Sequence, residues 1–334
     1  MLKAILLSIV FPSVLAAQTG KLDIWWVDVE GGAATLIVTP TGESFLIDTG
    51  NPGERDAARI FDVATRQAGL RKIDALFTTH YHGDHVGGAP ALSKLIPITK
   101  YYDHGDSVEP EGSGGKPWIA YKSVAAGNRS PVKPGQVIQL REVKLDVVSS
   151  AGKVLSKPIN GGGPNPFCDG AIQKDIDKSE NGQSAGLLLT YGKFKFFDIG
   201  DLTWDREMML ACPVNKVGAV TLLQATHHGF FNDASGAPAL YNALKPVVVV
   251  VNNAPKKGLQ PSAYELISKL PGVEGVWQLH EAVDSDNAHN TAEQKIANPG
   301  SEDQGHWVKA TVAKDGSFTL TNSRNQFSET YQSR

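Results

Sequence analysis

The feature that most constrains this chain is a short apolar segment that runs directly into a cluster of histidines. Residues 73–79 are apolar, rich in strand-forming side chains and few in number, which predicts a buried strand. His80 and His82 follow at once, and because side chains alternate along extended backbone, both should point to the same side. Asp84 and His85 come after a glycine, which lets the chain turn and present them to the same cavity from another direction. The pattern predicts a site for two metal ions.

The chemistry of these side chains indicates which ions the site would hold. Imidazole nitrogen and carboxylate oxygen suit zinc, with manganese or iron as alternatives, whereas a closed structural zinc site would be richer in thiolates. Histidines at a strand end can also be ordinary surface residues, and a single His-x-His is weak evidence. Four potential ligands within six positions, residues 80–85, favour a catalytic metal site instead.

The first 17 residues have the pattern of a secretory signal peptide. Lys3 precedes an apolar run, Pro12 interrupts that run, and the small residues Ala16 and Ala17 stand at the expected cleavage position. The run is too short for a membrane-spanning helix, and no basic cluster follows that would favour an uncleaved anchor. We therefore predict a secreted or periplasmic protein, cut near Ala17, with no membrane contact after cleavage.

The rest of the composition is that of an ordinary globular protein. The chain is 41% hydrophobic and 20% charged, and loss of Lys3 with the leader changes the formal net charge from −3 to −4. No long run of like charge is present, so we do not expect a strong nucleic-acid footprint. We expect a small-molecule or nucleotide-like substrate instead. Cys168 and Cys212 are the only cysteines, and the sequence leaves open whether they pair.

Hydrophobic periodicity predicts many short strands with a few helices between them. The predicted strands are residues 22–29, 34–38, 44–47, 73–79, 98–102, 136–140, 143–148, 185–190, 193–199, 219–225, 246–251, 275–279, 307–312 and 317–321, and the predicted helices are 52–68, 89–95, 202–209 and 262–270. Residues 106–117 and 149–184 are rich in glycine and proline, and the longer of these two segments should border the site. No linker separates two cores, so residues 18–334 are expected to form one domain.

Four motifs resemble those of the metallo-β-lactamase-fold hydrolases. They are residues 46–50, 79–85, 199–202 and 227–229. The resemblance implies an α/β fold, a four-layer αββα sandwich of mixed sheets, with the metals in a cleft along one edge where both sheets end. Within the superfamily, residues 27–36, residues 181–184 and the double histidine at 227–228 look most similar to the domain at the C-terminus of competence-type DNA-uptake proteins.

The resemblance also implies roles for particular residues. The metal ligands would be His80 and His82 at the first ion, Asp84, His85 and His227 at the second, and Asp201 between both ions. Asp48 would orient a ligand imidazole through a hydrogen bond, and Asn181 would support the site in a similar way. His228 is either the ligand in place of His227 or a donor to a substrate oxyanion, because neighbouring residues at a strand end are expected to point in opposite directions.

Local alternatives exist for two of these acids and for the ligands of the first ion. Asp48 could cap a turn and Asp201 could cap a helix. The superfamily usually places a further first-metal histidine in the region corresponding to residues 149–184, and this segment has none. Cys168, Asp169, Asn181 or a water would have to take its place, so the first site is predicted to bind its metal more weakly. Gln260 also stands where the competence-type pattern has a histidine before proline.

These features predict an exported metal-dependent hydrolase. Two metal ions would make water a hydroxide nucleophile at neutral pH, and Asp84 would accept or shuttle its proton. Phosphodiesters are the first expectation for the substrate, from the resemblance. The alternatives are a lactam or lactone hydrolase and a metal-binding module that has lost catalysis.

Overall fold

The computed structural model describes residues 20–231 and 234–334, so the predicted signal peptide at residues 1–17 lies outside the described residues and stays a prediction. The first of its two nine-stranded sheets has the spatial order β18 (Ser328–Gln332), β17 (Ser317–Asn322), β16 (Val308–Val312), β1 (Leu22–Trp26), β2 (Thr35–Val38), β3 (Ser44–Ile47), β4 (Ile73–Phe77), β5 (Ile98–Asp103) and β6 (Arg129–Pro131). The second has the order β15 (Ile296–Asn298), β14 (Gly275–His280), β13 (Val248–Val251), β12 (Leu222–Gln224), β11 (Phe194–Asp198), β10 (Gly186–Tyr191), β8 (Lys144–Ser150) and β7 (Val137–Gln139), with β9 (Lys153–Val154) paired to β8.

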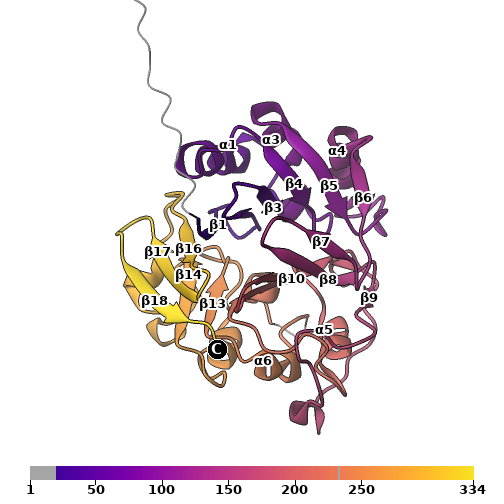
Figure 1. Cartoon of the computed structure of the whole chain (residues 1–334), viewed down its shortest axis with the longest axis vertical. Coiled ribbons are helices and arrows are strands. Elements are labelled where there is room, and N and C mark those ends of the chain that lie inside the picture. The colour runs from indigo at the N-terminus through magenta and orange to yellow at the C-terminus, as the bar shows by residue number, and fades with distance from the viewer. Residues whose placement is uncertain (1–19, 232–233) are drawn as a thin grey trace, which may run out of the picture.

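Helices cover the outer face of each sheet. On the first sheet these are α1 (Glu54–Asp62), α3 (Ala89–Leu95) and α4 (Gly115–Ala125), and on the second they are α5 (Trp204–Ala211), α6 (Pro238–Leu244) and α7 (Pro261–Ser268). Figure 1 shows α1, α3 and α4 on one side of the molecule and α5 and α6 on the opposite side. The shorter helical segments are α2 (Gly83–Val86), a π-helical turn (Val63–Gln67) and the 3-10 turns Pro166–Cys168, Asn181–Gln183, Thr226–Gly229, Asn287–His289 and Glu293–Lys295.

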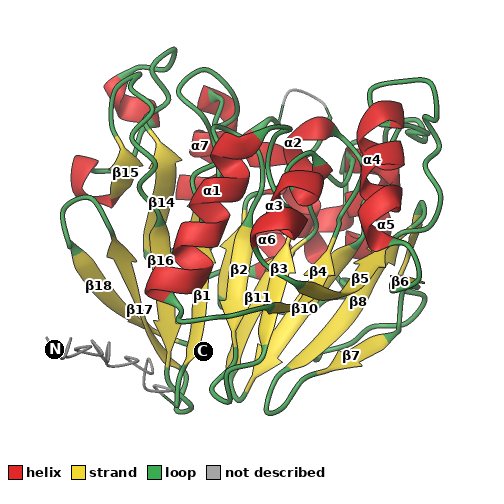
Figure 2. Ribbon diagram, turned by 90° about the horizontal axis from the view of Figure 1, so that it is seen from above, coloured by secondary structure: helices red, strands yellow, loops and turns green. Residues whose placement is uncertain are grey.

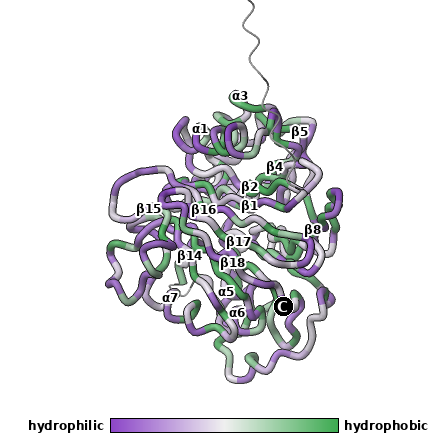
Figure 3. The backbone as a smooth tube through the Cα atoms, turned by 60° about the vertical axis from the view of Figure 1, so that its left-hand side comes forward, coloured by the Kyte–Doolittle hydropathy of each residue, from purple (hydrophilic) through white to green (hydrophobic). Residues whose placement is uncertain are grey.

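Three apolar cores hold the four layers together. Strand β1 illustrates why, because Leu22, Ile24 and Trp26 pack between the two sheets while Trp25 packs against the helices outside the first sheet. A strand buried on both faces needs apolar residues at successive positions, and every residue of β1 is buried. In Figure 3, hydrophobic segments lie along the central strands and hydrophilic ones are common in the outer loops. The predicted αββα sandwich of mixed sheets in a single domain is confirmed.

Strand direction sets the position of the candidate site. Strands β3 to β6 are mutually parallel, as are β11 to β15, so their carboxyl ends can meet at one edge. The short helix α2, which contains Asp84 and His85, lies at this edge beyond the strand ends in Figure 2. In the described part of the chain, none of the helices has the length and apolar character needed to span a bilayer.

Several local predictions differ from the structure. The predicted strand 22–29 ends at Trp26, and the predicted helix 52–68 divides into α1 and a π-helical turn. Residues 106–117 are not wholly loop, because α4 begins at Gly115 with Pro117 in its first turn, where proline costs no helical hydrogen bond. Helix α6 and strands β15 and β18 were not expected.

The long segment 149–184 is tied down by a covalent bond. Cys168 and Cys212 form a disulfide, with their Cα atoms 5.6 Å apart. Cys212 follows directly on the last residue of α5, so the bond fastens the loop to the helix that begins just after Asp201. It also settles the pairing that the sequence left open and removes Cys168 as a thiolate ligand.

Candidate metal centre

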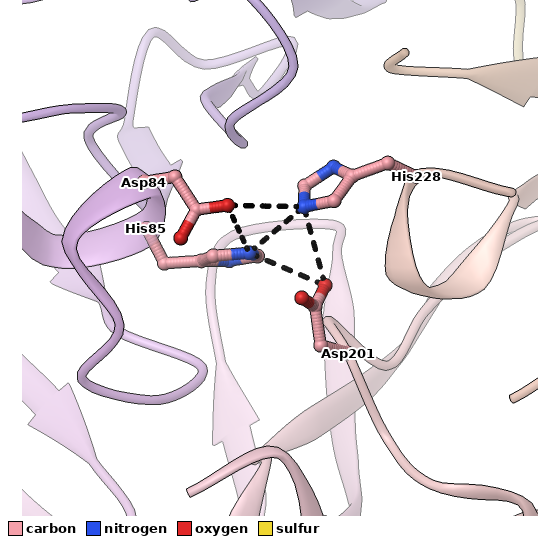
Figure 4. A group of neighbouring side chains, drawn as sticks. All are labelled: Asp84, His85, Asp201 and His228. Carbon is pink, nitrogen blue, oxygen red and sulfur yellow. Dashed lines mark hydrogen bonds and ion pairs between the residues drawn. The ribbon is translucent and has the colours of Figure 1, made fainter. Parts of the chain in front are cut away.

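Side chains from four strand ends converge on one point. Asp48 follows β3, His80 follows β4, Asp201 follows β11 and His228 follows β12. Figure 4 shows that Asp84, His85, Asp201 and His228 direct their polar atoms toward one another. Residues far apart in the sequence therefore meet where the parallel strands of both sheets end.

The spacing of Asp84, His85, Asp201 and His228 is close to that of a tetrahedral ion site. The separations are 3.2 Å for His85 Nε2 to Asp201 Oδ1, 3.2 Å for His85 Nε2 to His228 Nε2, 3.4 Å for His228 Nε2 to Asp84 Oδ2, 3.5 Å for His228 Nε2 to Asp201 Oδ1 and 3.8 Å for His85 Nε2 to Asp84 Oδ2. Ligands bound tetrahedrally at 2.0–2.2 Å from an ion stand roughly 3.3–3.6 Å from one another. These five separations are thus close to those of ligands around one divalent ion, and the sixth, between Asp84 and Asp201, lies within 4.8 Å.

Buried polar atoms without hydrogen bonds indicate that the site is built for a cation. Among the described residues, His80 Nε2, His82 Nε2 and Asp201 Oδ1 are buried and make no hydrogen bond. Buried nitrogen and oxygen atoms normally have partners, because desolvation without compensation is costly. Their chemistry is that of zinc ligands, so the residues fit the metal that the sequence predicts.

The two oxygens of Asp201 face different sets of histidines. Oδ1 lies in the cluster with His85 and His228, whereas Oδ2 is 3.9 Å from His80 Nε2 and 3.5 Å from His227 Nε2. The rings of His80 and His82 lie side by side, with their centroids 4.7 Å apart. The geometry therefore suits the predicted role of Asp201 between two ions, which stays a prediction.

The double histidine differs from its predicted arrangement. The structure places His228, rather than His227, with Asp84 and His85. His227 lies on the other side of Asp201, and its Nδ1 is 3.2 Å from Ser235 Oγ. Both histidines have left-handed backbone, with φ of 52° and 57°, which costs energy in non-glycine residues. This conformation turns both imidazoles toward Asp201 instead of opposite ways. A role for His228 as a donor to substrate stays a prediction.

Asp48 has the orienting position expected from the sequence. Its carboxylate accepts hydrogen bonds from Thr79 N at 2.8 Å and Thr79 Oγ1 at 2.7 Å, and His85 Nδ1 donates to it at 2.7 Å. This last bond fixes the ring of His85 so that Nε2 faces the cluster. Asp48 therefore acts on the site through His85 and does not itself face the four-residue cluster.

Without an ion, electrostatics favour the ligand form of Asp84, Asp201 and His80, whereas nearby carboxylates raise the pKa of His85 and His228, which must each lose a proton when a metal binds. Burial would raise the pKa of Asp201, but His85 and His228 hold the pKa of Asp201 well below its usual range. Burial likewise opposes ionisation of Asp84, yet the nearby positive groups leave its pKa well below normal. Burial lowers the pKa of His80 well below 6.5, so its imidazole is neutral and able to bind a metal.

Three charged residues near the site were not predicted from the sequence. Lys257 Nζ bonds Gly31 O at 2.6 Å and also contacts Asp84 Oδ2. Glu109 Oε2 is 3.6 Å from His82 Nε2, and the buried Glu180 accepts a hydrogen bond from Tyr81 N at 3.3 Å. Glu180 directly precedes the motif at residues 181–184, which is the one hint that the sequence offered.

The glycine pair at residues 31–32 explains part of the motif at 27–36. A Cβ on Gly32 would lie 2.3 Å from the backbone oxygen of Asp84, so no larger residue fits there. Ala33 N donates to the same oxygen at 3.0 Å. The connection between β1 and β2 thus packs directly against the metal-binding turn.

Asn181, Asp169 and His280 lie in different surroundings. Asn181 has a buried Oδ1 without a hydrogen bond among the described residues, and its supporting role stays a prediction. Asp169 lines a separate, largely apolar cavity of about 270 Å³. His280 bonds Asp28 at 2.7 Å, where Arg59 already supplies a positive charge 3.2 Å from the same carboxylate. We interpret that buried pair as structural.

Comparison with known proteins gives a consistent family. Residues 27–167 match the profile of the Metallo-beta-lactamase superfamily. A UPF0173 metal-dependent hydrolase of Cupriavidus metallidurans is 40% identical over 24% of this chain and 26% of its own length. Another, from Cupriavidus necator, is 25% identical over 74% of this chain and 79% of its own length.

Two further comparisons are more distant. An atrochrysone carboxyl ACP thioesterase of Emericella nidulans is 26% identical over 36% of this chain and 33% of its own length. Among solved structures, the metallo-beta-lactamase fold protein YhfI of Bacillus subtilis aligns with a TM-score of 0.49 and 10% identity, over 77% of this chain and 96% of YhfI. The closer resemblance to the competence-type domain stays a prediction.

Proposed function

We propose that this chain is a metal-dependent hydrolase of the metallo-β-lactamase superfamily, and that it uses two divalent ions, preferably zinc, to hydrolyse phosphodiester-type substrates. The observation that supports the metal chemistry is the tetrahedral spacing of Asp84, His85, Asp201 and His228. His80 and His82 would provide ligands for the first ion, on the other side of Asp201. When bound, such ions supply Lewis-acid activation of water and neutralise charge that develops on the substrate.

The residues around the cluster provide the rest of the chemistry. We assign Asp84 to accept the proton of the attacking water, because its carboxylate lies in the cluster with His85, Asp201 and His228. Asp48 holds His85 in one orientation, so the ligand geometry does not have to rearrange during the reaction.

Lys257 favours an anionic substrate. Its side chain is 42% exposed, and its ammonium forms an ion pair with Asp84. A cation at the mouth of a site raises the local concentration of negatively charged ligands. This supports a phosphodiester over a neutral lactam or lactone, and it agrees with the nucleotide-like substrate expected from the sequence.

A carboxylic ester or thioester is the second candidate, because the Emericella nidulans relative is named as an ACP thioesterase. The deciding assay compares turnover of bis-p-nitrophenyl phosphate, nitrocefin, a lactone and an acyl thioester, each with zinc and with manganese. We expect the phosphodiester to give the highest kcat/KM. A higher value for any other substrate would replace the proposed substrate class, and no turnover with both metals bound would support a non-catalytic metal-binding module.

We also propose that the protein acts after export, in the periplasm or outside the cell, as its first 17 residues predict. The disulfide Cys168–Cys212 supports this, because such bonds persist mainly in oxidising compartments. N-terminal sequencing of the protein from its native host should start near Gln18. A retained Met1 would contradict cleavage.

A further inference from the structure

The side of the centre around His80 and His82 has fewer obvious ligands than the side around His85. Residues 149–184 contain no histidine, and Cys168 is bonded to Cys212. His82 Nε2 is buried and makes no hydrogen bond among the described residues. A buried imidazole nitrogen of this kind needs a partner, which a metal ion together with a further ligand would provide.

Glu109 has a carboxylate oxygen close to this nitrogen. Its Oε2 is 3.6 Å from His82 Nε2, which is too long for a hydrogen bond but within the 3.2–3.8 Å range of the ligand separations around His85 and His228. The two atoms thus face each other at the distance expected of neighbours on one ion. Carboxylate oxygen is also a normal partner for imidazole in zinc, manganese and iron sites.

The carboxylate of Glu109 is held in place from two sides. Oε1 accepts a hydrogen bond from Glu180 N at 2.9 Å, and Oε2 accepts one from Ser113 Oγ at 2.7 Å. An acid that was only a flexible surface residue would not be fixed in this way at both oxygens. Each oxygen retains a lone pair, so Oε2 can still bind a metal.

Glu180 fastens the loop that contains Glu109 to the metal-binding turn. It is fully buried, and it accepts hydrogen bonds from Val108 N at 2.7 Å, His104 Nε2 at 3.0 Å and Tyr81 N at 3.3 Å. Tyr81 stands between His80 and His82 in the sequence, so Glu180 connects the backbone of the ligands to the loop of Glu109. The loop is therefore held in part by the buried contacts of Glu180 with Tyr81 and His104.

We propose that Glu109 is a ligand of the first metal ion and takes the place of the histidine that residues 149–184 lack. The inference rests on the proposed function, because it requires that the centre binds metal. The ligand that completes the first metal site would then come from the loop before α4, which contains Glu109. The family resemblance had placed it in residues 149–184, before β10.

The test is metal binding by Glu109→Gln, whose amide oxygen can still accept the bond from Glu180 N. Zinc per chain would be measured by elemental analysis over a series of buffered free-zinc concentrations, and the absorption spectrum would be recorded after loading with cobalt. We expect the wild type to bind two equivalents. The variant should bind one ion as tightly as the wild type, and its affinity for the other ion should fall by more than about 100-fold. This loss exceeds the roughly 10–100-fold loss of metal affinity expected when a supporting residue is removed. The cobalt spectrum should also change.

Three further variants provide controls. Glu111→Gln changes an exposed acid in the same loop and should bind like the wild type. Glu180→Gln loosens the loop but keeps the carboxylate of Glu109, so it should weaken the ion less and retain the cobalt spectrum. Asn181→Ala tests the alternative ligand from the absent-histidine region.

Each contrary result has one meaning. Two tightly bound ions in Glu109→Gln would overturn the ligand role and leave the proposed function intact. An equal loss in Glu180→Gln would reduce Glu109 to a positioning residue, and a loss confined to Asn181→Ala would assign the ligand to Asn181, so either result also overturns the inference. Less than one zinc in the wild type would reject the proposed function as well.

Discussion

The two halves of the metal centre differ in how the chain builds them. Around His85, four ligand atoms from three distant segments stand at tetrahedral spacing, and Asp48 orients the imidazole from behind. Around His82, two histidines from one short segment face Asp201 on one side and Glu109 on the other. The His85 half combines helix α2 with the ends of β11 and β12, whereas the His82 half also depends on a loop held by Glu180. We therefore expect the His85 half to bind its ion more tightly.

The largest effect should come from the residue that both halves share. Asp201→Asn keeps the shape of the side chain but removes the negative charge that faces histidines on both sides. Both ions should bind more weakly, and kcat/KM should fall by about 1000-fold or more, since metal activation contributes several kcal/mol. Steady-state kinetics and elemental analysis would measure this. Unchanged activity in the folded variant would remove Asp201 from the centre.

The next comparison separates the two adjacent histidines. His228→Ala removes a member of the four-residue cluster and should weaken one ion by about 100-fold or more, whereas His227→Ala should have a smaller effect. Zinc titration of both variants at the same pH gives the difference. If His227→Ala weakened metal binding more than His228→Ala, the result would favour His227 as the ligand beside Asp84 and His85, as the sequence predicts.

Asp48→Asn should have an intermediate effect. The variant keeps a side chain of the same size but weakens the bond from His85 Nδ1 that fixes the ring. Loss of such a supporting carboxylate typically costs 10–100-fold in metal affinity or activity. The ion on the His85 side should be affected, while the ion near His82 keeps its affinity. Equal weakening of both ions would show that Asp48 acts on the fold as a whole.

The smallest effect on metal binding should come from a buried acid outside the centre. Burial raises the pKa of Glu207 to about 7, from 4.5, whereas the histidines keep that of Asp201 low. The folded state thus favours protonated Glu207, and this contribution to stability is lost as pH rises from about 4.5 through 7. Glu207→Gln should therefore gain stability relative to the wild type, by up to about 3 kcal/mol, between pH 5 and pH 8.

Chemical denaturation of both proteins in the presence of a chelator would measure this difference. A difference between variant and wild type that did not depend on pH would contradict the raised pKa. Zinc binding by the variant at pH 7 should match that of the wild type.

Local patterns in the sequence determined the fold class and the types of metal ligand. Apolar runs of strand length predicted most of the strands, and residues 80–85 place four ligands so close together that any turn after β4 would gather them. Asp48 and Asp201 could be predicted because each lies in a recognised motif, Asp48 directly after β3 and Asp201 a few residues after β11. Helices α4 and α6 could not, because glycine and proline obscure their starts.

Only the tertiary structure decided how the centre is completed. Which of His227 and His228 joins His85 depends on two left-handed backbone positions, and the pairing of Cys168 with Cys212 depends on where a long loop meets α5. The approach of Glu109 to His82 depends on buried bonds to Glu180. These contacts join residues far apart in the chain, and their distances follow from sheet register and loop packing, which no short stretch of sequence encodes.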